Sequence, residues 1–325
     1  MSNVKVHTLD LPLFVNKFLK SIPGVGYHIA SYLWEIRLFF FLLGKFKKKH
    51  FDLAVKSSYG SYRWPSFLWF FSKELILDPI GGGERFPIRY LSIFSTKGKI
   101  NELFRIFMQW LPRLDPLVLI TLANASKIYP ISEDSKTILP KYAQSKCIIK
   151  QNYLQINPDD FEIVEAKKST KKDPNTLKIF YTGRMLEWKG SMFVLKALRK
   201  IKDQIKYEFN LMGKGPALQV WKDYAIKYNL NVNFINPDDV PRKDLSYYFF
   251  DHDIFAFATL HGAGGYAPVE AKLHEMTLLT LDISGLDGRL NDDDIIITCK
   301  QKSSDGIVDE IATRLLDYFK KNKSQ

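Results

Sequence analysis

Two basic side chains occur close together on a segment that follows a predicted strand. The strand covers residues 179–182, and Arg184 and Lys189 come after Gly183, before the next helical pattern. Ligands of open α/β sheets bind at the carboxyl ends of strands, so both cations can point into one crevice. There, two separate positive charges could neutralise a diphosphate. The alternative is that both are ordinary exposed surface charges.

A glycine-rich turn follows the next predicted strand, residues 209–212. The turn consists of Gly213, Lys214, Gly215 and Pro216. Glycines let the backbone come close to a ligand, and the proline suits the first position of the helix that follows. A plain strand-to-helix turn has the same composition, so this turn alone does not decide between the two interpretations.

A second glycine-rich turn lies after the predicted strand 254–258. It runs from His261 to Gly264 and Gly265 and leads into a helix. Such a turn presents unpaired N–H groups and the positive end of the helix dipole, which suits a phosphate group. Glu270, inside the helix, could accept hydrogen bonds from a ribose diol. The alternative for Glu270 is a solvated helix carboxylate.

The elements that would position these residues alternate regularly along the chain. Apolar runs of strand length are separated by longer segments with helical periodicity, such as 193–205 and 308–319, each with one apolar stripe. The predicted strands are 179–182, 209–212, 232–235, 254–258, 278–281 and 295–298. Strands that are apolar throughout are typical of a parallel sheet covered by helices on both faces, so we predict the α/β class.

The first half of the chain shows a weaker pattern of the same kind. Its candidate strands are 52–55, 75–77, 127–131 and 146–149, separated by helical segments such as 102–111. Residues 156–176 are polar, with two prolines and a KKSTKK run, which is the composition of an exposed connector. We therefore expect two α/β domains, 1–155 and 177–325, joined by the linker 156–176.

Taken together, the three segments resemble the nucleotide-sugar domain of family 4 glycosyltransferases of the GT-B fold. The resemblance implies two Rossmann-like domains. It also implies that the loop with Arg184 and Lys189 binds the donor diphosphate, that the turn 213–216 lines the site and that Glu270 binds ribose. The donor-binding residues carried over in this way are Gly183, Arg184, Lys189, Gly213, Lys214, Gly215, Pro216, His261, Gly264, Gly265 and Glu270. Arg184, Lys189 and Glu270 are also the expected catalytic residues.

The first half resembles a subgroup of the same family that carries a PIGGGE segment, residues 79–84 here. The acceptor-side residues implied are Gly81, Gly82, Gly83 and Glu84. Three glycines after a strand allow a sugar to approach the backbone closely, and a tight interdomain turn explains them equally well.

The chain also departs from the family pattern. Nothing before Asp52 reads as a strand, a glycine loop and a helix in that order, so the first domain is expected to be incomplete. A histidine common in the family is absent from the residues 56–59. Gly262 stands eight residues before Glu270, where the family has an acidic residue that contacts the transferred sugar.

The resemblance implies a metal-independent, retaining hexosyltransferase that needs no cofactor. Its expected donor is a nucleotide-diphosphate sugar, and its expected acceptor is a surface polysaccharide or a lipid-linked glycan. The alternative is a truncated relative, weakly or not catalytic, that binds a nucleotide sugar or a partner enzyme. The departures before Asp52 and at Gly262 favour that alternative.

The charge distribution points to a polyanionic partner of the first half. The net charge is +12, and residues 1–150 hold 22 basic against 10 acidic side chains while the rest is balanced. Nucleic acid and the anionic face of a membrane both fit this charge. No nucleic-acid-binding motif is present, so we expect no nucleic acid and keep an anionic membrane surface as a partner. The apolar segment 29–44 precedes a run of lysines, and it predicts either a core helix or an amphipathic helix whose basic end meets headgroups.

The remaining chemistry-bearing residues predict no metal site. The histidines have no zinc-ligand spacing, and Asp251-His252-Asp253 directly precedes a buried strand and supplies too few ligands. Cys147 and Cys299 are far apart and match no disulfide or redox pattern, which fits a reducing cytoplasm. The expected location is cytoplasmic, with a peripheral position on the inner membrane face.

Overall fold

The computed structural model describes residues 4–22, 26–57, 60–150, 173, 175–262, 264–286 and 288–323. The chain forms two compact units: Met1–Glu84 with Arg105–Asn152, and Arg85–Phe104 with Tyr153–Gln325. We refer to them as unit 1 and unit 2. Most of the expected linker 156–176 lies outside the described residues.

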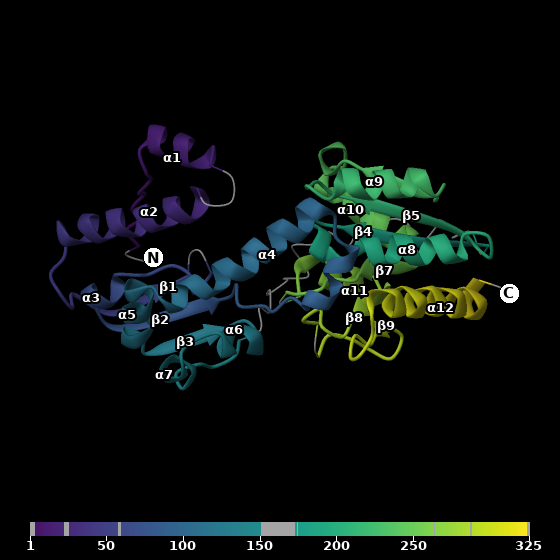
Figure 1. Cartoon of the computed structure of the whole chain (residues 1–325). Coiled ribbons are helices and arrows are strands. Elements are labelled where there is room, and N and C mark those ends of the chain that lie inside the picture. Colours follow the sequence, from purple (N-terminus) through teal and green to yellow (C-terminus); the bar gives the residue numbers. More distant parts are fainter. Residues whose placement is uncertain are drawn as a thin grey trace. The chain divides into compact units, whose positions relative to one another are not determined.

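Unit 2 is built around a six-stranded parallel sheet. Its strands are β4 (Thr176–Thr182), β5 (Lys206–Met212), β6 (Val232–Ile235), β7 (Ile254–Phe257), β8 (Thr277–Leu281) and β9 (Ile295–Ile297). They lie in the order β6-β5-β4-β7-β8-β9, and every neighbouring pair is parallel (Figure 1). The prediction of six strands in one parallel sheet is confirmed.

Helices cover both faces of this sheet, which explains why its strands are apolar throughout. Successive side chains of a strand point to opposite faces. Phe180 packs edge-on against Phe249 of α10 (Leu245–Asp251), with ring centroids 5.4 Å apart. The next residue, Tyr181, meets Trp221 of α9 (Leu218–Lys227) at 6.2 Å.

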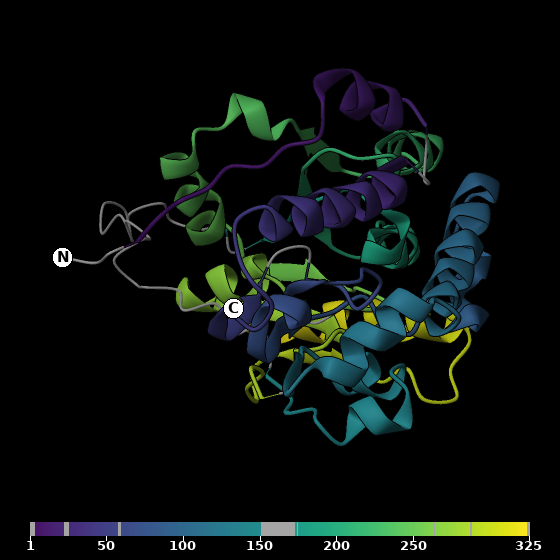
Figure 2. The ribbon, with the colours of Figure 1, turned by 90° about the vertical axis from the view of Figure 1, so that its left-hand side faces the viewer.

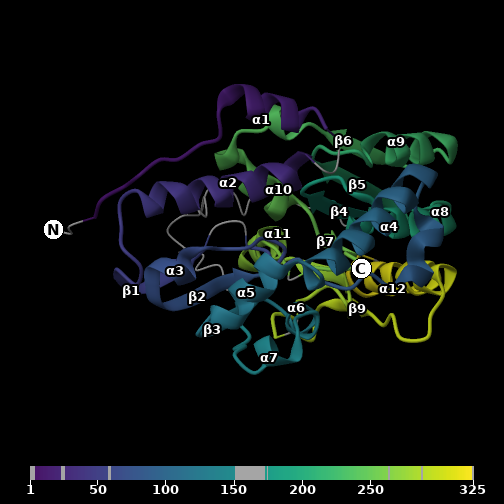
Figure 3. The same ribbon diagram turned by 60° about the vertical axis from the view of Figure 1, so that its left-hand side comes forward.

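Two long amphipathic helices confirm the predicted periodicities. Helix α8 (Ser191–Ile201) buries its apolar stripe, and α12 (Ser304–Lys323) lies beside it, as Figures 1 and 3 show. Helix α11 (Tyr266–Leu273) follows β7. A helix connects each strand from β4 to β7 to the next one along the chain, whereas the residues between β8 and β9 form no helix in the part of the chain that the structure describes.

The segment Arg85–Phe104 differs from the expected division at residue 155, because it packs with unit 2. It holds the 3-10 helix η1 (Ile88–Ile93) and the start of α4 (Thr96–Trp110). Tyr90 is fully buried, its ring meets Phe193 at 5.9 Å, and its hydroxyl donates to the carbonyl of Cys299 at 2.9 Å.

Unit 1 contains a three-stranded parallel sheet among its described residues. Strands β1 (Phe51–Lys56), β2 (Ser72–Ile80) and β3 (Lys127–Pro130) lie in that order. Helix α5 (Pro116–Asn124) precedes β3, and α6 (Glu133–Thr137) and α7 (Lys141–Gln144) follow it. Val118 and Leu122 of α5 share a core with Leu75 and Leu77 of β2.

The predicted strand 146–149 is wrong. This segment forms only an isolated bridge between Cys147 and Ile128. Its backbone still lies beside β3: the Ile128 N–H donates to the Lys146 carbonyl at 3.1 Å, and the Ile148 N–H donates to the Ile128 carbonyl at 2.9 Å. The predicted strands at 52–55, 75–77 and 127–131 are confirmed as parts of β1, β2 and β3.

The apolar segment after residue 25 forms one helix, α2 (Gly26–Leu43), with α1 (Leu13–Lys20) alongside it, both purple in Figure 2. Phe39 of α2 packs on Phe70 and Phe71, at ring distances of 5.8 and 5.7 Å. Phe71 ends the short helix α3 (Leu68–Phe71).

A buried ion pair joins α2 to the sheet of unit 1. Glu35 and Lys56 are 2% and 4% exposed, and their charged atoms are 3.1 Å apart. The Lys56 ammonium also donates to the carbonyl oxygens of Trp64 and Pro65. Burial raises the pKa of Glu35 and lowers the pKa of Lys56, and each partner opposes the shift of the other.

No single described helix is long and apolar enough to cross a membrane, whereas the bent pair Thr96–Arg113 and Pro116–Asn124 together meets the same criteria of length and composition.

Candidate functional site

Three loops with the predicted site residues follow three adjacent strands of unit 2. Residues 183–190 follow β4, residues 213–217 follow β5, and residues 258–265 follow β7. In the sheet β4 lies between β5 and β7, and all three run parallel. Their carboxyl ends therefore share one edge, which is where open α/β sheets bind ligands.

The first two loops interlock through their backbones. The N–H of Met185 donates to the carbonyl of Lys214 at 2.8 Å. A Cβ on Gly213 would lie 1.9 Å from the Gly183 oxygen, and one on Gly215 would lie 2.2 Å from the Met185 oxygen. Both glycines also have positive φ values, +157° and +155°. Glycine is required at these two positions by the packing of the loops themselves.

Lys189 lies on an aromatic surface close to Arg184. It ends the 3-10 helix η4 (Glu187–Lys189), and its ammonium is 4.5 Å from the Trp188 ring centroid and 5.1 Å from that of Phe257. Burial, followed by the charge of Arg184, lowers the pKa of Lys189 to about 8. Among the described residues neither cation forms an ion pair with a carboxylate, so the pair is suited to bind an anion.

This lowered pKa predicts how diphosphate binding depends on pH. Only the protonated ammonium attracts a phosphate, so affinity should fall as the pH rises through about 8, by up to about tenfold per pH unit. Lys189→Arg keeps its charge in this range and should give a flat profile. Calorimetric titration of a nucleoside diphosphate from pH 7 to 9.5 measures both, and parallel profiles for the two proteins would contradict the prediction.

The same shift predicts that Lys189 costs stability in the unliganded protein. Its folded pKa of about 8 lies below its ordinary value of 10.5, so between these values the unfolded chain binds more protons. The free energy of unfolding should therefore rise as the pH rises from about 8 to 10.5. Below pH 8 the destabilisation caused by the charged Lys189 ammonium is fully present. Lys189→Met should stabilise the protein by about 1 kcal/mol in urea unfolding at pH 7. Destabilisation by this substitution would contradict it.

The third loop packs directly on the first. The His261 ring stacks on Trp188 at 4.2 Å, and the N–H of Leu260 donates to the Trp188 carbonyl at 2.9 Å. His261 is buried, and its Nε2 lies 3.7 Å from an oxygen of Glu102, which also belongs to unit 2. His261 therefore joins the third loop to the loop that carries Lys189.

The glycine turn before α11 lies against a residue that the sequence did not indicate. Gly264 has a φ of +78°, and a Cβ there would lie 2.9 Å from the Nη1 atom of Arg289. Arg289 comes from the loop after β8, the strand next to β7. Gly265 caps the N-terminus of α11, so the predicted start of the helix is confirmed.

Glu270 is buried in an ion pair rather than solvated. It is 4% exposed, and its carboxylate pairs with Arg242 from the 3-10 helix η6 (Arg242–Asp244). The alternative of a solvated helix carboxylate is therefore wrong. Arg242 is a second residue that the sequence did not indicate, because its loop is brought to α11 only by the fold.

The acceptor-side residues 81–84 form a closely packed turn in unit 1. The carboxylate of Glu84 accepts hydrogen bonds from the Gly82 N–H at 3.1 Å and from the Ser135 hydroxyl at 2.7 Å. The Gly82 carbonyl accepts from Arg63 and Gln109. A Cβ on Gly81 would lie 2.5 Å from the Ile131 side chain, and one on Gly83 would lie 2.7 Å from Ser135 Cα.

The segment 251–253 has a structural role. Asp251 pairs with the Lys178 ammonium at 2.7 Å, and Asp253 accepts from the Lys178 N–H at 2.9 Å. His252 is buried between Tyr248 and Asn210, to which its two ring nitrogens bond. The described residues contain no group of three or more potential ligands that could hold a metal ion.

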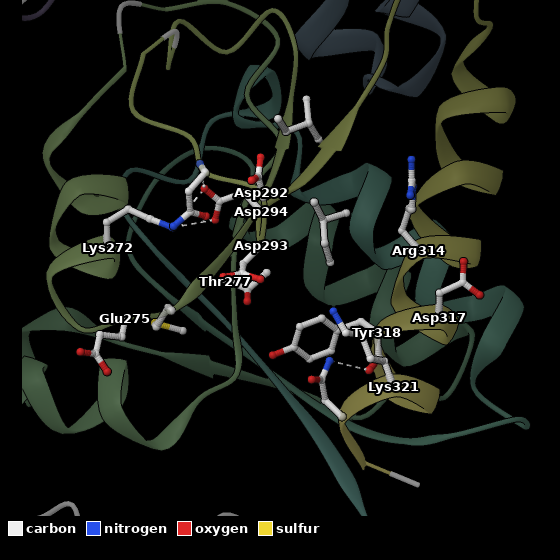
Figure 4. Close-up of a pocket in the computed structure, with 15 residues that line it drawn as sticks. Lys272, Glu275, Thr277, Asp292, Asp293, Asp294, Arg314, Asp317, Tyr318 and Lys321 are labelled. Atoms are coloured by element: carbon white, nitrogen blue, oxygen red, sulfur yellow. Dashed lines mark hydrogen bonds and ion pairs between the residues drawn. The ribbon is translucent and has the colours of Figure 1, made fainter.

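A cavity of about 690 Å³ in unit 2 lies at the other end of the sheet. It is lined by Thr277 and Ile295, which begin β8 and β9, and by Arg314 and Tyr318 of α12 (Figure 4). Figure 4 also shows Lys272 paired with Asp294 at its edge. The cavity is separate from the three loops, which follow the carboxyl ends of their strands.

Solved proteins share this architecture of parallel sheets in α/β units. The pneumococcal O-GlcNAc transferase GtfA in complex with UDP and GlcNAc is 11% identical with a TM-score of 0.54, covering 89% of this chain and 53% of its own. A glycosyltransferase from Rickettsia africae is 11% identical with a TM-score of 0.52, covering 99% and 80%. At this identity the likeness defines the fold: two Rossmann-like domains of the GT-B class.

The model of the family glycosyl transferases group 1 matches residues 162–325, half of the chain. The chain therefore belongs to the glycosyl transferases group 1. No curated protein matches it.

Proposed function

We propose that the chain transfers a hexosyl unit from a nucleotide-diphosphate sugar to a surface polysaccharide or a lipid-linked acceptor, with retention and without a metal ion. The observation that carries the proposal is the pair Arg184 and Lys189 after β4, two close cations without a carboxylate partner among the described residues. A diphosphate supplies the two negative charges that this pair lacks.

The cations would also drive the chemistry. Negative charge accumulates on the diphosphate as its bond to the sugar breaks, and fixed positive groups stabilise that transition state. Lys189 is shielded by Trp188 and Phe257, which strengthens its interaction with the leaving group. The N–H groups at Gly264 and Gly265 would contribute at the start of α11.

The nucleoside would be held beside the same turn. Glu270 would accept hydrogen bonds from the ribose hydroxyls, and the ion pair with Arg242 would hold its buried carboxylate in position. The UDP in the GtfA structure supports a nucleotide-sugar donor for a chain of this fold. We place the chain in family 4, in the subgroup with the PIGGGE segment, on the resemblance of its residues.

The acceptor would bind unit 1 at the turn 81–84, and the basic first half would hold the protein peripherally at the inner face of an anionic membrane. The cytoplasm supplies the nucleotide sugar in this arrangement.

A single-turnover assay tests the proposal. The purified chain is mixed with radiolabelled nucleotide sugars and with liposomes that carry anionic lipid and lipid-linked acceptor, in EDTA. We expect sugar transfer from one donor class, lost in Arg184→Ala. Transfer that requires Mg²⁺ or Mn²⁺ would contradict metal independence. Donor binding without transfer in every mixture would favour the non-catalytic relative.

A further inference from the structure

Unit 1 contains an apolar pocket of about 440 Å³, within the range of roughly 300–1,000 Å³ that ligand pockets occupy. It lies between α2, the segment around Trp64, the end of α4 and the 3-10 helix η2 (Leu111–Arg113). The apolar side chains that line it include Ile29, Leu33, Trp64, Met108 and Leu111.

The polar groups of this pocket are neutral or satisfied, with one exception. Asp115 accepts from the Tyr32 hydroxyl at 2.6 Å and from two N–H groups at the start of α5. Burial, followed by the charge of Arg63, lowers the pKa of His28, which leaves its ring neutral near pH 7. Arg63 is therefore the cation of the pocket lining, and Asp115, held by these hydrogen bonds, is its carboxylate.

Arg63 connects the pocket to the turn 81–84. Its Nη2 donates to the Gly82 carbonyl at 3.1 Å, whereas its buried Nε has no hydrogen-bond partner among the described residues. A Cβ on Gly82 would lie 3.7 Å from this Nε atom. The pocket thus has apolar walls and a cationic end beside the turn proposed for the acceptor.

We propose that this pocket binds the hydrocarbon chain of a lipid-phosphate acceptor, with the phosphate at Arg63, next to the turn 81–84. The inference rests on the proposed function and names its acceptor class as an amphiphile with one phosphate next to the chain. An anion in the pocket pairs with the positive charge of the Arg63 guanidinium, and an alkyl chain removes water from the apolar walls. Exposed apolar residues beside it, Leu33 at 39% and Leu114 at 80%, suit a site that opens toward lipid.

Calorimetric titration of the full chain with dodecyl phosphate, dodecanol and inorganic phosphate tests the inference. Dodecyl phosphate should bind at least tenfold more tightly than either fragment, because it alone occupies both ends of the pocket. Leu33→Trp fills the pocket and should weaken dodecyl phosphate at least tenfold. Leu43→Trp, on the same helix but outside the pocket, is the matched control and should change affinity less than twofold.

The charged end is tested with a second pair of variants. Arg63→Met should bring the affinity for dodecyl phosphate down to that for dodecanol, and Arg63→Lys should retain at least part of the preference. Thermal melting identifies any variant that fails to fold. If an Arg63 variant does not fold, the comparison of Leu33→Trp with Leu43→Trp tests the inference. No binding of dodecyl phosphate by the native chain, or equal effects of Leu33→Trp and Leu43→Trp, would overturn the inference.

Nucleoside diphosphate binding separates this inference from the proposed function. Arg184 and Lys189 of unit 2 do not line this pocket. A native chain that binds nucleotide but not dodecyl phosphate therefore contradicts the lipid-phosphate site alone. A chain that binds dodecyl phosphate but no nucleotide or nucleotide sugar overturns the proposed function.

Discussion

Arg184→Ala combined with Lys189→Ala is expected to weaken nucleoside diphosphate binding by at least about 100-fold. Each lost hydrogen bond to a charged group costs about 1.5–3 kcal/mol, and 1.4 kcal/mol corresponds to a factor of ten. The two single effects are not expected to add, because the charge of Arg184 lowers the pKa of Lys189. Calorimetry with a nucleoside diphosphate and with its bare nucleoside measures the effect.

Two comparisons control this experiment. The bare nucleoside should bind the double variant within twofold of the native chain, since neither cation is expected to contact base or ribose. Lys200→Ala removes an exposed cation of α8, which is paired with Asp309 of α12. This substitution should leave the affinity for the diphosphate within twofold of the native value. Equal losses for nucleoside and diphosphate would contradict the assignment of these residues to the phosphates.

Glu35→Ala is expected to destabilise the protein by about 3–5 kcal/mol. It leaves Lys56 as a buried charge without its carboxylate, and removal of one member of a buried ion pair costs this much. Lys56 also holds the Trp64 and Pro65 carbonyls, so the loss extends to a wall of the apolar pocket. Urea unfolding at pH 7, followed by a probe of unit 1, gives the free energy.

Replacing both partners distinguishes the pair from simple packing. Glu35→Met with Lys56→Met removes both charges at similar volume and should recover most of the lost stability. Asp52→Ala breaks an exposed pair with Lys73, which water screens, and should leave the free energy of unfolding nearly unchanged. A cost of Glu35→Ala no larger than that of Asp52→Ala would show that the buried pair does not stabilise unit 1.

The fold of unit 2 could be predicted from the sequence because its strands carry a signal of their own. Strands such as β7, buried on all four residues, are continuous apolar runs, and α8 and α12 repeat apolar residues at helical spacing. The loops after β5 and β7 could be located for the same reason, since a glycine-rich turn follows each of these two runs.

What could not be predicted depends on contacts between distant segments. Arg242 and Arg289 lie on irregular loops, and only the three-dimensional arrangement brings them to Glu270 and to Gly264. Glu35 is a charge within an apolar helix, and no local pattern shows that Lys56 pairs with it. The segment Arg85–Phe104 has the composition of its neighbours in sequence, although it packs with unit 2.

A crystal structure of the chain with a bound nucleoside diphosphate tests the central claim most directly. We expect diphosphate oxygens at hydrogen-bond distance, roughly 3 Å, from the side chains of Arg184 and Lys189, and the ribose beside Glu270. We expect the same contacts when the crystals are grown without a divalent metal ion. A diphosphate bound instead in the cavity lined by Lys272, Arg314 and Lys321 would contradict the account, because it would place the anion at the opposite end of the sheet.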